Sequence, residues 1–355
     1  MEKEFYVHPF RQPIKWSINK KTNDFSITIL SSPEKQDIPF RIDCLGIEDT
    51  GNDSENMIKD WPQAIDFALI RHKSNFDKPW LVIFMLHGWT SNKQTMIEQC
   101  EDMIKEMQKT LTPKQIQGIW FVPINAPFSM TCEERGTSLS DAIHSSNTLH
   151  SLVDEDTEQR FWWQIDGVKG LQDFLDNRLH RFFERREKGF DMSLAYLDSI
   201  LSVVHNMTKG DASFCMMGFS QGGGMAFNTA INLFEKYPFC GVILCSSLLT
   251  NTDRCIMDAQ RYTLKENMTF EKFKRVPLLL THGYQDTTLF TEVGDRFYYF
   301  LSDKIGMKSV DYINFEGYHE ITDQVRQRIS VHIQRMYEYH KSQKTSLLPN
   351  YLMFT

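Results

Sequence analysis

A five-residue motif has the residue types that covalent chemistry at a serine requires. It contains Gly218, Ser220, Gln221 and Gly222, fits the pattern GxSxG, and lies between an apolar run at 213–219 and the start of a helical pattern. In a strand–turn–helix setting the sharp turn lifts the serine hydroxyl above the sheet, and the two glycines leave room for the neighbouring strand and helix. The helix N-terminus favours a developing oxyanion, to which the Gln221 backbone N–H can donate. We predict that Ser220 is a nucleophile, with Gly218 and Gly222 shaping its turn.

A serine nucleophile needs a general base, and four histidines follow Ser220 in the chain. His319 lies on a predicted loop between the last apolar run and the last helical pattern, where an imidazole can be reached, and we predict that it is the base. His332 and His340 share a helix face with apolar residues, which is typical of the edge of a core. His282 ends a predicted strand ahead of the expected acid, which favours a buried, hydrogen-bonded role.

A carboxylate must hold the base in the correct tautomer and stabilise its imidazolium form. Asp286 follows a predicted strand and therefore lies at the carboxyl edge of the sheet, where the active sites of open α/β folds collect. We predict that it is this acid. The alternatives, Asp295 and Asp303 on a predicted helix and Asp311 within a strand, fit solvated faces.

A second oxyanion donor is expected from the loop after an earlier strand. His87, Gly88 and Trp89 end the first strong apolar run. We predict that the Trp89 backbone N–H is the donor, and that His87 and Gly88 shape the loop without His87 acting as the base.

Continuous apolar runs and helical periods alternate from residue 80 onward, which predicts a mostly parallel α/β sheet flanked by helices. The predicted strands are 80–86, 118–124, 213–219, 240–246, 276–281 and 309–315. The predicted helices are 93–110, 194–207, 221–236, 290–303 and 320–340.

The ends of the chain differ from this pattern. Runs at 24–30 and 40–45 alternate apolar and polar residues, as half-exposed strands do. We therefore divide the chain into a β-rich N-terminal extension at 1–75, an α/β domain at 76–345 and a tail at 346–355.

Two stretches interrupt the α/β alternation. Residues 131–159 are acidic and rich in Ser and Thr, which predicts a polar loop, and 170–188 has a helical pattern. Together, 131–188 form a candidate cap insertion over the site.

Composition excludes several classes. The 355 residues carry a net charge of −7, so the chain has no basic field for nucleic acid. Its apolar runs are far shorter than the roughly 18 residues that span a bilayer, and its first ten residues lack a targeting pattern. Seven cysteines, an odd number without metal-type pairs, indicate a reduced compartment, and we expect a cytoplasmic protein.

Taken together, these motifs resemble the phospholipase/carboxylesterase family of the α/β-hydrolase superfamily, which includes the acyl-protein thioesterases. The similarity spans residues 80–340 in the family's order. The motifs that carry it are His87-Gly88, Asn125-Ala126-Pro127, Trp162-Trp163-Gln164-Ile165-Asp166, Gly218 to Gly223, His282-Gly283 through Asp286, and Gly317-Tyr318-His319.

The resemblance implies an α/β-hydrolase fold and a triad of Ser220, Asp286 and His319 that hydrolyses carboxylic esters or thioesters through an acyl-serine intermediate. It implies no metal and no organic cofactor, and candidate substrates that include lipids and lipidated proteins. The sequence departs from the family at Trp89-Thr90-Ser91, where the family has a second glycine and an acid. With this altered loop and the unmatched extension, the alternative is a hydrolase fold reused as a structural or binding subunit, with the extension contacting a protein partner.

Overall fold

The computed structural model describes residues 64–72, 78–129, 159–165, 183–184, 187–264 and 268–346, together with four strands nearer the N-terminus. Residues 131–158 of the predicted polar loop, most of the predicted helix at 170–188 and residues 347–355 of the predicted tail lie outside the described residues.

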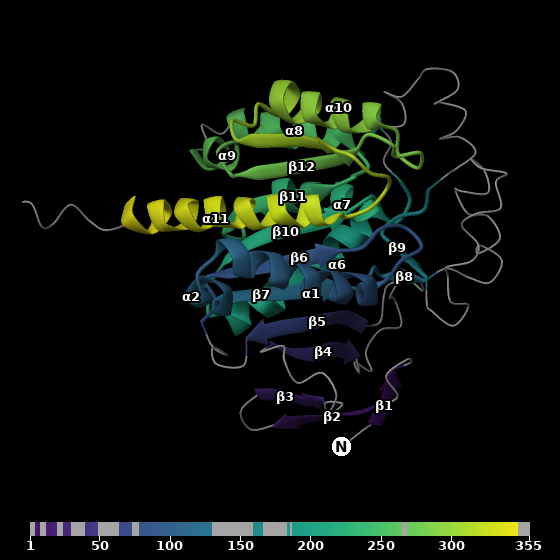
Figure 1. Ribbon diagram of the computed structural model, residues 1–355, viewed down its shortest axis with the longest axis vertical. Helices are drawn as coiled ribbons and strands as arrows, with labels where there is room; N and C mark the ends of the chain where they lie inside the picture. Colours follow the sequence, from purple (N-terminus) through teal and green to yellow (C-terminus); the bar gives the residue numbers. More distant parts are fainter. Residues whose placement is uncertain are drawn as a thin grey trace, which may run out of the picture.

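Six parallel strands form the centre of an eight-stranded sheet, and each corresponds to a strand predicted from a continuous apolar run (Figure 1). Their order across the sheet is β13-β12-β11-β10-β6-β7. The strands are β6 (Leu81–Leu86), β7 (Ile119–Ile124), β10 (Ser213–Phe219), β11 (Phe239–Cys245), β12 (Leu278–Gly283) and β13 (Val310–Phe315).

Two antiparallel strands from the N-terminal part extend the same sheet. β5 (Ala64–His72) pairs with β7, and β4 (Phe40–Glu48) pairs with β5. Residues 40–48 and 64–72, which the sequence placed in the extension, therefore belong to the main sheet. A separate antiparallel sheet of β1 (Glu4–Val7), β2 (Gln12–Asn19) and β3 (Asp24–Ile29) lies beyond β4 (Figure 1).

Helices cover both faces of the sheet, as the alternation of strands and helices predicts. On one face pack α6 (Phe190–Met207), α7 (Gln221–Leu233), α8 (Thr252–Leu264), α9 (Met268–Phe273) and α10 (Thr291–Tyr299), which the short η2 (Phe300–Ile305) follows. On the other face pack α1 (Lys93–Thr110), α2 (Pro113–Gln117) and α11 (Asp323–Ser346). Each of the five helices predicted at 93–110, 194–207, 221–236, 290–303 and 320–340 overlaps one of these helices, whereas α2, α8 and α9 were not predicted.

The side chains of the central strands explain why the sheet is buried on both faces. In β6, Val82, Phe84 and Leu86 enter the core under α6 and α7, and the residues between them enter the core under α1 and α11. All six side chains are buried. The α/β fold predicted from the sequence is therefore confirmed. In open sheets of this kind, ligands bind beyond the carboxyl ends of the strands. No helix in the described ranges has the length and apolar character needed to cross a membrane.

We expect a chain that begins at residue 78 to lose its fold, because β5 supplies core side chains. Phe67, Leu69 and Ile70 are each at most 3% exposed. Each such side chain contributes roughly 1.5–3 kcal/mol, against a typical domain stability of about 5–15 kcal/mol. Urea unfolding and soluble yield measure the effect, and a chain that begins at residue 38 is the control, since it keeps β4 and β5. Equal stability of the two truncated chains would contradict the expectation.

Candidate active site

Ser220 lies in a strained turn between β10 and α7. Its φ of 53° and ψ of −120° lie in a region that side chains rarely adopt. A Cβ at Gly218 would lie 2.2 Å from the Gly222 carbonyl oxygen, and one at Gly222 would lie 2.4 Å from the His87 carbonyl oxygen. Both glycines are therefore required by close backbone packing, which is the geometry that the GxSxG pattern predicts.

Backbone hydrogen bonds hold this turn in place. The Ser220 N–H donates to the Cys245 carbonyl at 2.9 Å, and the Ser220 carbonyl accepts from the N–H groups of Leu248 and Gly223, each at 3.0 Å. The turn is thus tied to the end of the neighbouring strand β11, so the position of Ser220 is fixed by the sheet.

His319 and Asp286 form a hydrogen-bonded pair at the carboxyl edge of the sheet. The His319 Nδ1–H donates to Asp286 Oδ2 at 2.7 Å, and Asp286 Oδ1 accepts from the backbone N–H groups of Thr288 at 2.9 Å and Leu289 at 2.8 Å. The acid side chain is fully buried, whereas the histidine side chain is 16% exposed. Because Asp286 fixes the proton on Nδ1, Nε2 of His319 is left to act as a base.

The loops that carry this pair lie against each other and against the serine turn. Asp286 follows β12 and His319 follows β13, and a Cβ at Gly283 would lie 2.4 Å from the Tyr318 carbonyl oxygen. The ring of Phe219, which precedes Ser220, lies 4.8 Å from the His319 ring between centroids. The structure therefore brings the three residues predicted as a triad to one edge of the sheet.

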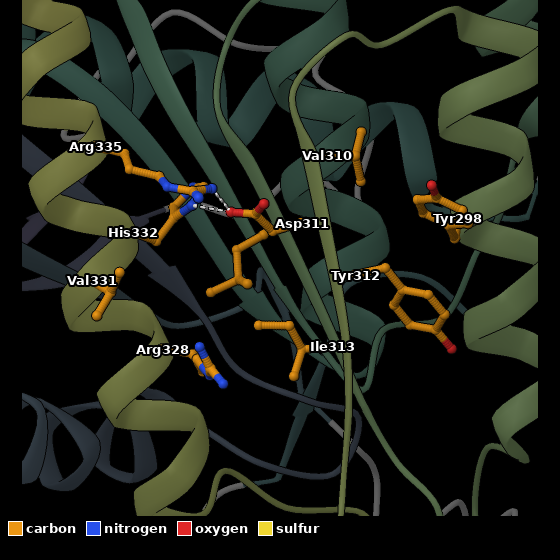
Figure 2. A pocket seen from close by; sticks show the side chains of 10 residues that line it. Tyr298, Val310, Asp311, Tyr312, Ile313, Arg328, Val331, His332 and Arg335 are labelled. Atoms are coloured by element: carbon orange, nitrogen blue, oxygen red, sulfur yellow. Dashed lines mark hydrogen bonds and ion pairs between the residues drawn. The ribbon is translucent and has the colours of Figure 1, made fainter.

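Two of the alternative histidines, His332 and His340, and two of the alternative acids, Asp295 and Asp311, are engaged elsewhere. His340 contacts Ser213 through Nδ1 at 2.6 Å, and Asp295 accepts a hydrogen bond from the Tyr312 hydroxyl. Asp311 pairs with Arg335 on α11, beside the buried His332, as Figure 2 shows.

These last three residues line a cavity of about 510 Å³ between β13, α10 and α11, and no residue of the predicted triad borders it (Figure 2). In the described ranges, no group of His, Cys, Asp and Glu side chains is arranged to hold a metal ion.

His87 shapes the loop beside the nucleophile. Its Nδ1–H donates to the Gly88 carbonyl at 2.7 Å, and its Nε2 accepts from the Ala126 N–H at 3.0 Å. Burial lowers the pKa of His87 to about 4, so the ring is neutral at pH 7 and cannot serve as an exposed base. A Cβ at Gly88 would lie 3.3 Å from the Cβ of Ser220, which shows how closely this loop approaches the nucleophile.

The residues that depart from the family pattern continue this loop. Thr90 has a φ of 61°, and the Ser91 carbonyl accepts from the Arg160 N–H at 2.9 Å. No described residue accepts a hydrogen bond from the Trp89 N–H. The loop thus has a defined shape in which Trp89, next to Gly88, keeps a backbone donor near Ser220.

The side chain of Gln221 has a role that sequence reasoning missed. It is buried, accepts from the Trp162 N–H at 2.9 Å and donates to the Trp163 carbonyl at 2.8 Å. The Trp162 indole N–H in turn donates to the His87 carbonyl at 2.8 Å. The two tryptophans therefore connect the serine turn to the loop at residues 87–91, which is the candidate oxyanion loop. Their place in the family motif was the one sequence signal for this connection.

Asp66 on β5 is a second residue that the sequence did not single out. Its carboxylate pairs with the Lys93 ammonium and accepts from the Asn125 amide at 2.6 Å. The other end of that amide accepts from the Lys93 backbone N–H at 2.7 Å. Asp66 thus joins the N-terminal strand, the loop after β7 and the first residue of α1, which directly follows the oxyanion loop.

A parallel sheet flanked by helices, with a serine in a strained turn after a central strand, defines an α/β-hydrolase. The model of the family described as "Serine hydrolase (FSH1)" matches residues 80–329, which is most of the chain. The chain therefore belongs to the FSH1 serine hydrolase family, and the class predicted from the sequence is confirmed.

Solved structures of several esterases are similar to this chain. Acyl-protein thioesterase 2 of Zea mays is 15% identical with a TM-score of 0.48, over 75% of this chain and 98% of that one. Esterase PE8 is 17% identical with a TM-score of 0.47, over 74% and 95%. A ferulic acid esterase is 12% identical with a TM-score of 0.49, over 85% and 98%. No curated protein sequence matches the chain.

Because of His87, the free energy of unfolding should decrease as the pH is lowered from about 6.5 to about 4. In the unfolded chain this histidine binds a proton below its ordinary pKa of 6.5, whereas in the folded chain it stays neutral down to about pH 4. The unfolded state binds more protons in this window, so stability decreases as the pH falls, by roughly 3 kcal/mol for a buried group. Urea unfolding from pH 7 to pH 4 should show a smaller loss in His87→Asn, and parallel curves would contradict this assignment.

The Gln221→Met variant should be less stable by roughly 1–3 kcal/mol. Methionine fills a similar volume but leaves the buried Trp162 N–H and Trp163 carbonyl without partners, which carries their desolvation cost. The matched control is Gln94→Met, because Gln94 is a glutamine on α1 whose side-chain amide, among the described residues, hydrogen-bonds only with Glu98, at 3.4 Å on the surface. The control should change the free energy of unfolding in urea by at most about 0.5 kcal/mol. Equal effects of the two substitutions would refute the connecting role of Gln221.

Proposed function

We propose that this chain hydrolyses carboxylic esters or thioesters, with Ser220 as nucleophile, His319 as general base and Asp286 as the acid that orients it. The observation that carries the proposal is the 2.7 Å hydrogen bond from His319 to Asp286 at the same sheet edge as the strained Ser220 turn. Membership of the FSH1 serine hydrolase family supports the same reaction class.

In the first half of the reaction, Ser220 Oγ attacks the acyl carbon while His319 Nε2 takes the hydroxyl proton. The tetrahedral intermediate collapses as the imidazolium gives this proton to the departing alcohol or thiol, which leaves an acyl-serine. Water then attacks the acyl-serine with His319 again as base, and the carboxylic acid and free Ser220 are regenerated. Asp286 remains ionised throughout and stabilises the imidazolium.

The backbone N–H groups of Gln221 and Trp89 form the proposed oxyanion hole. Gln221 is the first residue of α7, so its N–H points out of the helix N-terminus toward developing negative charge. Gly88 brings Trp89 close to Ser220. Each such donor typically contributes on the order of 10²–10³ in turnover, because it stabilises charge that exists only after attack.

The substrate class follows from the chemistry of the triad. His319 can protonate a leaving oxygen or a leaving sulfur, so the same three residues serve alcohol esters and thioesters. Acyl lipids and acylated proteins carry both bond types and are the substrates we propose. The five cysteines whose side chains the structure describes are buried and form no disulfide with one another, which favours a reducing compartment, and we propose the cytoplasm.

Labelling with a fluorophosphonate probe and hydrolysis of p-nitrophenyl butyrate test this function. We expect the wild type to be labelled and active, and Ser220→Ala to lose labelling and roughly 10⁴-fold or more in kcat/KM. The matched control is Ser199→Ala, at an exposed serine on α6, which should leave both unchanged. An intact wild type that stays unlabelled would refute the proposal and favour the alternative, a hydrolase fold that serves as a binding subunit.

A further inference from the structure

His282, a second histidine, lies against the triad acid from inside the protein. It stands near the end of β12, four residues before Asp286, and its side chain is completely buried. Its Nε2–H donates to the Leu289 carbonyl at 2.6 Å, and the same nitrogen lies 3.4 Å from Asp286 Oδ2. This oxygen is the one that accepts from His319.

These contacts close a ring around the carboxylate. The peptide groups of Leu289 take part twice, because its N–H donates to Asp286 Oδ1 at 2.8 Å while its carbonyl accepts from His282. One residue therefore links His282 to one carboxylate oxygen, and His282 contacts the other oxygen directly. Replacing His282 would therefore remove a hydrogen bond that holds the loop after Asp286. It would also remove a contact that orients Oδ2 toward His319.

The hydrogen bond to Leu289 also fixes the tautomer of the neutral His282 ring. A carbonyl only accepts, so Nε2 carries the hydrogen and Nδ1 carries the lone pair. No described residue bonds to Nδ1, and a Cβ at Gly294 would lie 2.8 Å from it. The titratable groups near the ring are Asp286, Asp295 and His319. Burial, to which the charge of His319 adds, holds the pKa of His282 below its ordinary value, although the Leu289 carbonyl and the two carboxylates act to raise it.

We propose that His282 is a positioning residue of the hydrolase site, a neutral donor that fixes Asp286 and its loop so that Oδ2 stays aligned with His319. This inference rests on the proposed function, since it deepens the account of the same triad. His282 is not itself a base, because its Nε2 is engaged with Leu289 and its side chain is shielded from solvent.

Two substitutions separate the hydrogen bond from the bulk of the side chain. In His282→Gln, the amide nitrogen is as many bonds from Cα as Nε2 of histidine, so it can donate to Leu289. In His282→Asn, the amide nitrogen is one bond shorter and occupies the place of Nδ1, so that donor is missing. Thermal unfolding monitored by circular dichroism shows that each variant is folded before its kinetics are compared.

For His282→Asn we expect kcat on p-nitrophenyl butyrate to fall between about 10- and 100-fold, with KM changed by less than about two-fold. The acid limb of the kcat/KM profile should move to lower pH by about 0.5, because a misaligned carboxylate stabilises the His319 imidazolium less. His282→Gln should restore most of kcat and return the acid limb to its wild-type position.

Equal losses of kcat in the two variants, or a normal kcat in His282→Asn, would overturn the proposal. If His282→Asn does not fold, a folded His282→Gln with a low kcat and a displaced limb would overturn it equally.

A readout that needs no turnover distinguishes this proposal from the function itself. The proton between His319 Nδ1 and Asp286 gives a low-field signal in the proton NMR spectrum, which His319→Ala assigns by its loss. The signal should persist in His282→Gln and shift or disappear in His282→Asn. If the signal behaves in this way but the wild type hydrolyses no ester, the proposed function fails while the positioning role stands. An unchanged signal in His282→Asn overturns the positioning role.

Discussion

The positive φ of Ser220 is the constraint on which the rest of the site depends. A side chain in this conformation is unfavourable by about 1–3 kcal/mol, so it persists only where the surroundings determine it. Here β10 approaches α7 so closely that Gly218 cannot carry a Cβ, and α7 approaches the end of β6 so closely that Gly222 cannot carry one. The end of β11 and the residues after it supply backbone partners of the turn. The buried parallel sheet thus holds Ser220 in its partly exposed position, and the stability of the core is available to offset the local strain.

The oxyanion loop depends on side chains from distant parts of the chain. Gln221 and Trp162 connect it to the serine turn, and His87 connects it to the loop after β7. Asp66 anchors the start of α1 to β5. The loop has Thr90, with a φ of 61°, where the family pattern has its second glycine. The contacts with these distant side chains hold the loop in place without that glycine. An N-terminal strand therefore contributes to the active-site edge although its sequence carries no catalytic motif.

The sequence predicts the parts of the fold and site that follow from local patterns. Continuous apolar runs identify the six parallel strands because both of their faces are buried, and the places where these runs end locate Ser220, Asp286 and His319 at one edge. It did not predict β5, whose mixed residues neither alternate nor form a long apolar run, and which is ordered by pairing with β7. The contact of Gln221 with Trp162 joins residues 59 positions apart, and a contact of that kind depends on the tertiary fold alone.

The two histidines beside Asp286 have the same side chain, and their different burial is what separates the chemical roles that we propose for them. Both lie within reach of the same carboxylate oxygen, at 2.7 Å for His319 and 3.4 Å for His282. The inner ring is completely buried and faces Gly294 with its second nitrogen, so a positive charge on it would be costly. The outer ring is partly exposed, which suits the base that we propose. Because burial disfavours a charge on the inner ring, the proposed roles divide between the two: His319 takes the proton and His282 aligns the carboxylate.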